Sequence, residues 1–219
     1  RRYGFHGTSH KYVAERCADI MNVDIKDLKI ITCHLGNGAS VTAIKRGQVL
    51  DTSMGLTPLE GLIMGTRSGD LDPAIISFIC DKEHVTADEM LDILNKKSGV
   101  FGLSGGVSSD FRDLLQAAES GNEKAVDTLD AYAYRVGKYI GSYVAAMNGV
   151  DVIAFTAGIG ENNPQYRQAL GEKLAFLGVK IDEEKNHVRG QEIDITTPDS
   201  PIKVFVIPTD EELVIARDT

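Results

Sequence analysis

Residues 29–52 read KIITCHLGNGASVTAIKRGQVLDT, and this stretch decides the fold. Two β-rich runs, Lys29–Leu35 and Ser40–Lys45, flank the loop sequence GNGA. An Asn-Gly pair between two apolar runs is a strong signal for a β-hairpin. A second turn, Arg46-Gly47, leads into a third run, Gln48–Thr52. The stretch therefore predicts a meander of three antiparallel strands.

The remainder of the chain predicts strands that alternate with helices. The run 151–156 is apolar without alternation, as expected for a strand buried on both faces, and 202–207 is a second such strand. Apolar residues at helical spacing predict the longest helix around 122–148. Further helices are expected from Asp72-Pro73, Asp110 and Asn163-Pro164. Ser9 can cap another helix, and Thr86 with Glu89 predicts a capping box. The chain thus reads as an α/β domain spanning 1–219, with a mixed sheet (three antiparallel strands, then strand–helix–strand) and helices on both faces.

Composition excludes several classes of function. The formal net charge of -9 argues against nucleic-acid binding, which depends on Lys and Arg contacts to phosphates. No apolar run reaches the roughly 18 residues of a membrane span. The three unpatterned cysteines favour a reducing compartment, so we expect a cytoplasmic protein.

Two glycine-rich loops are candidate nucleotide sites. Glycines in 34–40 would let backbone N–H groups approach an anion, with Asn37 as an added donor, although the residues alone favour an ordinary hairpin beside a buried histidine. The break at 158–162 follows a buried strand, where ligands of α/β sheets collect. It could equally be a simple strand-to-helix turn, and it does not complete a Rossmann fingerprint.

Two further loops carry cations suited to phosphate. His6 and His10 are flanked by small residues, and a histidine in such a loop can donate hydrogen bonds to phosphoryl oxygens. At spacing i, i+4 they could bind a metal if helical, but Gly7 argues against a helix there. Arg67 lies between glycines in a long irregular stretch, which suits bidentate contact with phosphate or carboxylate. The alternatives are a surface loop and a solvated arginine.

Three other motifs are ambiguous from residues alone. Asp110 and Phe111 could contact a base, but helix capping with Phe111 in the core is the simpler interpretation. The acids in 210–212 could hold Mg²⁺ or could favour the positive end of a helix. The sequence 102–106 fits the G-x-S-x-G nucleophile elbow, yet a helix end rather than a strand precedes it, which argues against a serine hydrolase.

Taken together, these stretches resemble the acetate kinase (acetokinase) family. The matching motifs occur in the family order and span nearly the whole chain. They are RYGFHGTSH (2–10), HLGNGAS (34–40), MGTRSGD (64–70), FTAGIGEN (155–162) and PTDEE (208–212). The resemblance implies an actin-like, sugar-kinase-type (ribonuclease H-like) domain, one of two that face each other across a cleft.

The resemblance also implies the reaction ATP + acetate to ADP + acetyl phosphate, with Mg²⁺. It implies catalytic roles for His6, which contacts the transferred phosphoryl group, and for Arg67, which neutralises its charge. Glu211 would help position Mg²⁺. The implied nucleotide-binding residues are His34, Gly36, Asn37, Gly38, Asp110, Phe111, Arg112, Gly158, Ile159, Gly160 and Asn162. Position 210 is Asp where the family pattern leads us to expect Asn.

The family pattern includes an N-terminal domain that is not found in this sequence. That domain supplies further active-site residues, so we expect this chain alone to be inactive, and we expect the complete enzyme to be a homodimer. Two alternatives stay open at this point: a kinase for propionate or another short-chain carboxylate, and a non-catalytic ATP-binding module of the actin or chaperone type.

Overall fold

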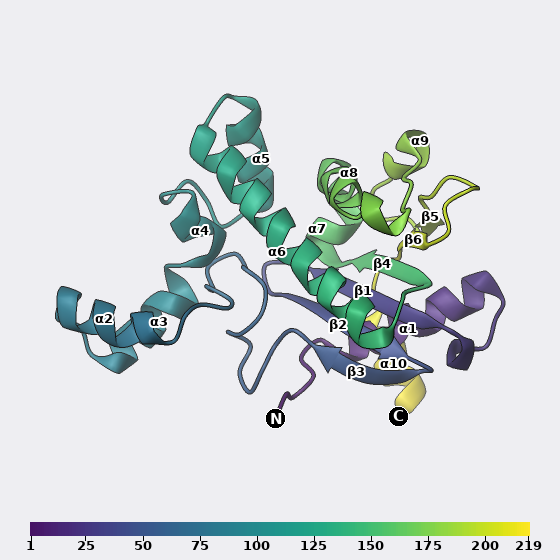
Figure 1. Ribbon diagram of the computed structural model, residues 1–219, viewed down its shortest axis with the longest axis horizontal. Coiled ribbons are helices and arrows are strands. Elements are labelled where there is room, and N and C mark those ends of the chain that lie inside the picture. The colour runs from purple at the N-terminus through teal and green to yellow at the C-terminus, as the bar shows by residue number, and fades with distance from the viewer.

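A six-stranded mixed sheet lies at the centre of the computed structural model (Figure 1). Its order is β3-β2-β1-β4-β6-β5, in which β1, β2 and β3 form the antiparallel meander and β1, β4 and β6 run parallel. The predicted mixed sheet is therefore confirmed, with a short antiparallel edge strand, β5, that the sequence did not reveal. The strands are β1 (Lys29–Leu35), β2 (Ala39–Lys45), β3 (Gln48–Thr52), β4 (Val152–Thr156), β5 (Ile193–Asp194) and β6 (Lys203–Val206).

The structure describes the backbone of residues 1–219 and every side chain except that of Asp218. Its helices are α1 (Gly7–Met21), α2 (Ala74–Glu83), α3 (Ala87–Lys96), α4 (Gly99–Leu103), α5 (Phe111–Glu119), α6 (Glu123–Met147), α7 (Ala157–Asn162), α8 (Pro164–Lys173), α9 (Glu183–Asn186) and α10 (Glu211–Asp218), with 3-10 turns at Ile25–Asp27 and Ala175–Leu177. Within the described residues, no helix combines the length and apolarity needed to cross a membrane.

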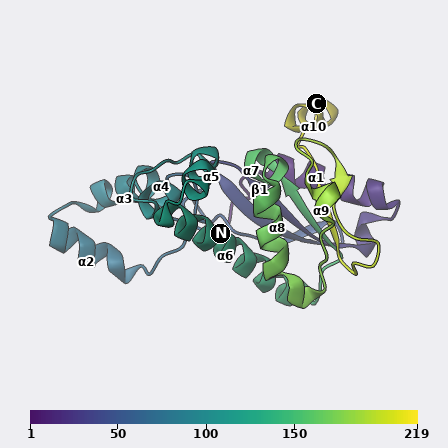
Figure 2. The same ribbon diagram turned by 90° about the horizontal axis from the view of Figure 1, so that it is seen from above.

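Helices cover both faces of the sheet, as predicted (Figure 2). On one face α6 and α8 pack over β1, β2 and β4, and form the larger core. On the other face α1 packs over β1 and β4, with α10 beside it. Side chains of β1 alternate between the faces: Ile31 and Cys33 belong to the larger core, while Ile30 packs under α1. This topology is the actin-like, sugar-kinase-type (ribonuclease H-like) fold that the motifs implied.

The two turns of the meander use different chemistry. Arg46 and Gly47 both have positive φ, 56° and 72°, as a two-residue type I′ hairpin requires. Neither Gly36 nor Gly38 has positive φ, so the first turn does not need glycine for its dihedral angles. Space explains Gly38, because a Cβ there would lie 2.9 Å from Nη2 of Arg67. The loop is glycine-rich because another segment packs against it.

Helix ends follow local capping rules in most places. Thr86 and Glu89 form the predicted capping box, and Asp110 and Asn122 cap α5 and α6 through their side chains. Asn163 caps α8, with Pro164 at its first position. The Asp72 carboxylate accepts from the Ala74 N–H. Helix α2 begins at Ala74, one residue after the expected start at Pro73.

The expectations for α1 were wrong in two respects. Ser9 does not cap the helix; instead its hydroxyl contacts Nδ1 of His34 at 2.9 Å. Gly7 does not exclude a helix, since α1 begins at that residue, after His6 in the left-handed conformation. A glycine in the first turn costs little when the turn is held by tertiary contacts.

Two segments predicted as loops contain short helices. The stretch 99–109 includes α4, whose Val100 and Phe101 N–H groups donate to the carbonyls of Met64 and Gly65. The break after β4 is α7, which packs against β1 and β4. Both helices are glycine-rich and have at most six residues, so only tertiary packing stabilises them.

The buried face of α6 includes Ala133, Val136, Ile140 and Met147. Val126 is exposed, whereas the aromatic rings of Tyr132 and Tyr143 are buried. By contrast, α2 and α3 project from the body of the molecule, and no residue of α2 is buried (Figure 2). Near the C-terminal end of α3, Leu94 is buried and its carbonyl accepts from the Ser68 N–H at 2.9 Å.

Candidate active site

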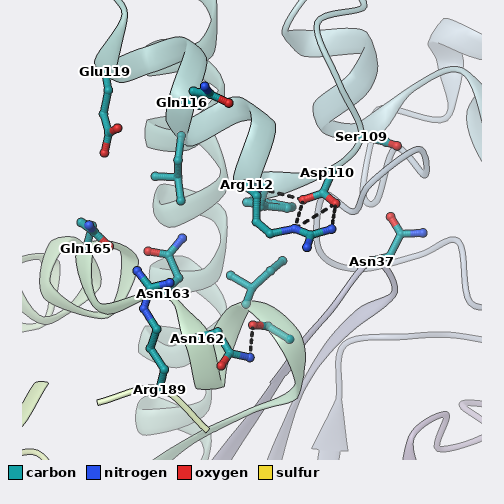
Figure 3. Close-up of a pocket in the computed structure, with 14 residues that line it drawn as sticks. Asn37, Ser109, Asp110, Arg112, Gln116, Glu119, Asn162, Asn163, Gln165 and Arg189 are labelled. Atoms are coloured by element: carbon teal, nitrogen blue, oxygen red, sulfur yellow. Dashed lines mark hydrogen bonds and ion pairs between the residues drawn. The ribbon is translucent and has the colours of Figure 1, made fainter. Parts of the chain in front are cut away.

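A cavity of about 870 Å³ opens between α5, α7 and the start of α8 (Figure 3). The carboxyl end of β4 leads directly into α7, so the cavity lies where α/β sheets bind ligands. The lining residues are Asn37, Ser109, Asp110, Phe111, Arg112, Leu115, Gln116, Glu119, Gly158, Ile159, Asn162, Asn163, Gln165 and Arg189.

The first turn of α5 forms one wall of the cavity. The Asp110 carboxylate accepts from the backbone N–H of Arg112 at 2.8 Å and from its Nη2 at 2.6 Å. These hydrogen bonds from Arg112 hold the pKa of Asp110 below its usual value. Phe111 is 5% exposed and meets the ring of Tyr132 edge-on. The capping interpretation of this motif is therefore correct, and the same residues also line the cavity.

The opposite wall is α7. Nothing lies within 4 Å of a Cβ placed on Gly158, so this glycine leaves open space at the cavity surface. The Asn162 amide donates back to the carbonyl of Gly158 at 3.1 Å (Figure 3). Oε1 of Glu161 accepts from the N–H groups of Ala157 and Thr209, at 2.7 and 3.3 Å. Glu161 thus ties the start of α7 to the loop that follows β6.

Asn37 connects the cavity to a second, cationic region. A Cβ at Gly65 would overlap Oδ1 of Asn37, so that glycine is what lets the two loops meet. On the other side, the position of a Cβ on Gly38 lies 2.9 Å from Nη2 of Arg67 and 3.7 Å from Nε2 of His6. The loop 36–38 therefore runs from the cavity to Arg67 and His6, the two side chains predicted to be catalytic.

Arg67 is a half-buried cation held by backbone. Its Nη1 donates to the carbonyl of Pro58 at 2.8 Å. Among the described residues, no carboxylate lies within ion-pair distance of it, and burial lowers its pKa. The loop that carries it is closed by Gly61 and Asp70, which exchange two hydrogen bonds. A cation fixed without a counter-ion is suited to bind an anionic ligand.

Three histidines lie together between α1 and the sheet. The rings of His6 and His34 stack at 3.9 Å between centroids. The hydroxyl of Ser40 contacts Nδ1 of His6 at 2.8 Å and Nε2 of His10 at 2.7 Å. Nδ1 of His10 in turn contacts the Thr32 hydroxyl at 2.7 Å. One hydroxyl hydrogen is shared between two imidazoles, so the tautomers of His6 and His10 are coupled.

Burial keeps these imidazoles neutral. It lowers the pKa of His10 to about 3, with contributions from His34 and His6. It also lowers the pKa of His34 to about 3, with a contribution from His6. The pKa of His6 is lowered by burial and by the charge of Arg67. At neutral pH the site therefore has one fixed positive charge, on Arg67, beside uncharged imidazoles.

Four predicted nucleotide-binding residues do not line the cavity. His34 lies in the histidine stack, and Gly38 lies beside Arg67. A Cβ at Gly36 would contact Cβ of Ala157 at 3.7 Å, so Gly36 fits the hairpin against α7. Gly160 is buried over the backbone of Phe155. None of these four residues is among those that line the cavity.

The acidic segment 210–212 behaves mainly as a helix start. The Asp210 carboxylate accepts from the Leu213 N–H and caps α10. Glu211 is in the first turn, is exposed, and is not among the cavity residues. In the part of the chain that the structure describes, no group of three or more His, Cys, Asp or Glu side chains is arranged to hold a metal.

The hydrolase alternative does not fit the structure. Ser104 follows helix α4 rather than a strand, and its side chain is buried. Its hydroxyl donates to the carbonyl of Phe101 at 3.1 Å. A buried serine without a histidine partner cannot act as a nucleophile.

Comparison with known proteins assigns the family. The model of the acetokinase family matches residues 1–217. The chain belongs to the acetokinase family.

Curated relatives agree with this assignment. The acetate kinase of Natranaerobius thermophilus is 63% identical over 218 residues, which cover 100% of this chain and 54% of that protein. The crystal structure of Porphyromonas gingivalis acetate kinase superposes with a TM-score of 0.97 at 50% identity, and covers 100% of this chain and 55% of that one. A propionate kinase from Francisella tularensis superposes with a TM-score of 0.92 at 44% identity, with shares of 100% and 55%. The chain thus spans about half the length of the acetokinases it matches.

Seven cavity residues were not predicted as site residues, and one of them, Ser109, directly precedes the predicted Asp110. Leu115, Gln116 and Glu119 follow Phe111 and Arg112 at helical spacing, so the periodicity of α5 could have indicated them. Asn163 and Gln165 open α8, where only the capping role was expected. No sequence signal pointed to Arg189, which belongs to an irregular segment before β5.

Proposed function

We propose that this chain is the nucleotide-binding portion of a kinase that transfers a phosphoryl group between ATP and acetate. The observation that carries the proposal is the continuous path from the cavity through Asn37 and Gly38 to Arg67 and His6. Adenosine would occupy the cavity, and the phosphates would extend along that loop. Phosphoryl transfer needs positioning and charge stabilisation more than covalent chemistry, which suits such a site.

In this reaction a carboxylate oxygen of acetate attacks the γ-phosphorus, and the oxygen bridging the β- and γ-phosphates leaves with ADP. Arg67 would neutralise charge on the transferred group, since no carboxylate competes for its guanidinium among the described residues. His6 would donate from Nε2 to a phosphoryl oxygen. That tautomer requires Nδ1 of His6 to accept from Ser40, and Ser40 then accepts from His10.

The described residues do not form a Mg²⁺ site by themselves. Mg²⁺ in kinases is commonly held by one or two carboxylates together with phosphates and water. Glu211 is the one carboxylate that we assign to Mg²⁺, through the family motif PTDEE (208–212). The proposal for Glu211 rests on its place after β6, two residues beyond Thr209, whose N–H donates to the Glu161 carboxylate.

The remaining expectations also belong to this proposal. We treat 1–219 as one nucleotide-binding domain that pairs with an N-terminal domain across a cleft, in a cytoplasmic homodimer. The half-length match to acetokinases supports the missing partner domain. The likeness to a propionate kinase keeps propionate as the second candidate substrate.

Calorimetric titration of Mg-ADP into this chain tests the nucleotide site, with Mg-GDP as comparator. Saturable ADP binding is expected, because the cavity walls are formed within this chain. Asp110→Ala and Asn37→Ala should each weaken ADP binding roughly tenfold. This is the effect expected when one or two hydrogen bonds to a charged or buried ligand group are lost. Asp113→Ala, on the same helix but outside the cavity, is the matched control.

Failure of ADP to bind would refute a preformed nucleotide site in this chain. If ADP binds, a panel of acetate, propionate and butyrate on the full-length enzyme distinguishes the substrates. Nucleotide binding without phosphoryl transfer to any carboxylate would favour the non-catalytic ATP-binding module instead.

A further inference from the structure

Arg189 lines the cavity from a segment that has no regular secondary structure. The segment 187–192 joins α9 to the edge strand β5. Arg112, on the facing wall, is paired with Asp110. Among the described residues, Arg189 is the cavity-lining cation without a carboxylate partner. Its position therefore decides which part of a ligand meets a free guanidinium.

The backbone on both sides of Arg189 is anchored to the end of α7. The carbonyl of Val188 accepts from Nη2 of Arg167 at 2.8 Å. The N–H of Gly190 donates to the carbonyl of Glu161 at 3.2 Å. Glu161 and its neighbours form the wall opposite α5, so hydrogen bonds on both sides of Arg189 connect its segment to that wall.

The anchor is Arg167, a fully buried arginine on α8. Its guanidinium makes five hydrogen bonds of 2.6–3.0 Å, all to carbonyl or amide oxygens. Two of these oxygens belong to the end of α7, two belong to Asn186 at the end of α9, and one belongs to Val188, next to Arg189. Burial, together with the nearby charge of Arg189, lowers the pKa of Arg167 to about 10, so it stays protonated at neutral pH. A buried charge satisfied in this way fixes the geometry of two segments at once.

The cavity has two distinguishable ends (Figure 3). Asn37 marks the end that continues to Gly38, Arg67 and His6. Arg189 points into the cavity at the other end, beside Asn163, and away from Asn37. A nucleotide whose phosphates lie along the Asn37–Gly38 loop would place its nucleoside near Arg189.

We propose that Arg189 binds the nucleoside end of the nucleotide, and that Arg167 is the positioning residue that holds it there. A guanidinium has donors and no acceptor, so it can donate to ring nitrogens or ribose hydroxyls and can stack on the base. This inference rests on the proposed nucleotide site, and extends it to a residue outside the family motifs.

Binding of ADP and of adenosine to three proteins tests the role of Arg189. The proteins are the unaltered chain, Arg189→Gln, and Lys82→Gln, which removes an exposed cation far from the cavity, on α2. We expect Arg189→Gln to weaken both ligands by the same factor, roughly two- to fivefold, the size of an exposed cation–π or single polar contact. Lys82→Gln should change neither affinity.

Two results would overturn the inference while leaving the nucleotide site intact. One is an unchanged affinity of Arg189→Gln for both ligands. The other is a loss for ADP without a loss for adenosine, which would assign Arg189 to the phosphates. If the unaltered chain binds neither ligand, the proposed function falls and this inference falls with it.

Arg167→Lys tests the positioning role, because a lysine has too few donors for the five acceptors. Arg167→Lys and Arg189→Gln should weaken ADP by similar factors, and the double variant should lose no more than either. A purely structural role would make the two losses add, which would refute the positioning role. Should Arg167→Lys fail to fold, Asn186→Ala replaces it in the same cycle, since it removes a side chain that contacts Nε of Arg167 at 2.8 Å.

Discussion

At the scale of single residues, the histidine cluster is the most constrained part of the site. His10 is 3% exposed, and both of its ring nitrogens contact hydroxyl groups. Neither of these hydroxyl groups carries a negative charge, so protonating the His10 ring would bury an uncompensated cation. The same network sets the tautomer that His6 presents beside Arg67, which links the stability of the cluster to the proposed chemistry.

The free energy of unfolding should therefore fall as the solution is acidified. His10 and His34 have folded pKa values of about 3, below the ordinary value of 6.5 that they regain on unfolding. Below pH 6.5 the unfolded state binds more protons, so stability is lost as the pH falls through the window between about 6.5 and 3. Each histidine should remove about 2 kcal/mol between about pH 7 and pH 5.

Urea denaturation over this pH range measures the effect, and variants assign it. His10→Gln should flatten the pH dependence, whereas His187→Gln, which alters an exposed histidine, should leave it unchanged. Equal slopes for both variants would contradict a role for the buried cluster.

At the scale of elements, α2 and α3 are only partly joined to the body of the molecule. They pack against each other, α2 contributes no buried residue, and Phe78 is 63% exposed. Local capping therefore carries much of the stability of this pair. The N-cap of α6, by contrast, belongs to the main helix that packs on the sheet in the larger core.

Removing the N-cap of α3 and the N-cap of α6 in separate variants should have different effects on stability. Thr86→Ala breaks the capping box of α3 and should speed amide exchange in α2 and α3 without changing exchange in the sheet. Asn122→Ala removes the cap of α6 and should lower global stability by about 1 kcal/mol. Hydrogen exchange read by mass spectrometry resolves both regions. An equal global loss from the two variants would show that the α2–α3 pair folds with the core.

At the scale of the whole molecule, the chain has the cavity walls and the cationic loop but spans about half the length of its relatives. Under the proposed function, the substrate carboxylate and the transferred group would also contact the other half of the enzyme. Arg67 and His6 alone supply one charge and one neutral imidazole at the reacting centre.

The purified chain should accordingly form negligible acetyl phosphate from ATP and acetate. The reason is that productive alignment of two substrates accounts for much of the rate enhancement, and half of a cleft cannot align them. Trapping of acetyl phosphate as a hydroxamate measures the product, with a full-length acetokinase as the positive control. Robust product from this chain alone would refute the need for a second domain.

The sequence by itself determined the features whose signals lie within a few residues. The meander followed from turn residues between β-rich runs, the capping box of Thr86 from a four-residue pattern, and α6 from its long periodicity. The family resemblance also named seven of the residues that line the cavity: Asn37, Asp110, Phe111, Arg112, Gly158, Ile159 and Asn162. These are local or motif-borne signals, and they do not depend on how distant segments pack.

Other features depend on contacts between segments that are distant in the sequence. Helices α4 and α7 are too short and glycine-rich to be stable alone, and their packing against other segments creates them. Gly38 needs its small size because Arg67, 29 positions later, packs against it. Arg189 reaches the cavity because buried Arg167 binds its segment to α7. Such placements follow from the summed packing of the whole core, which no short stretch of sequence encodes.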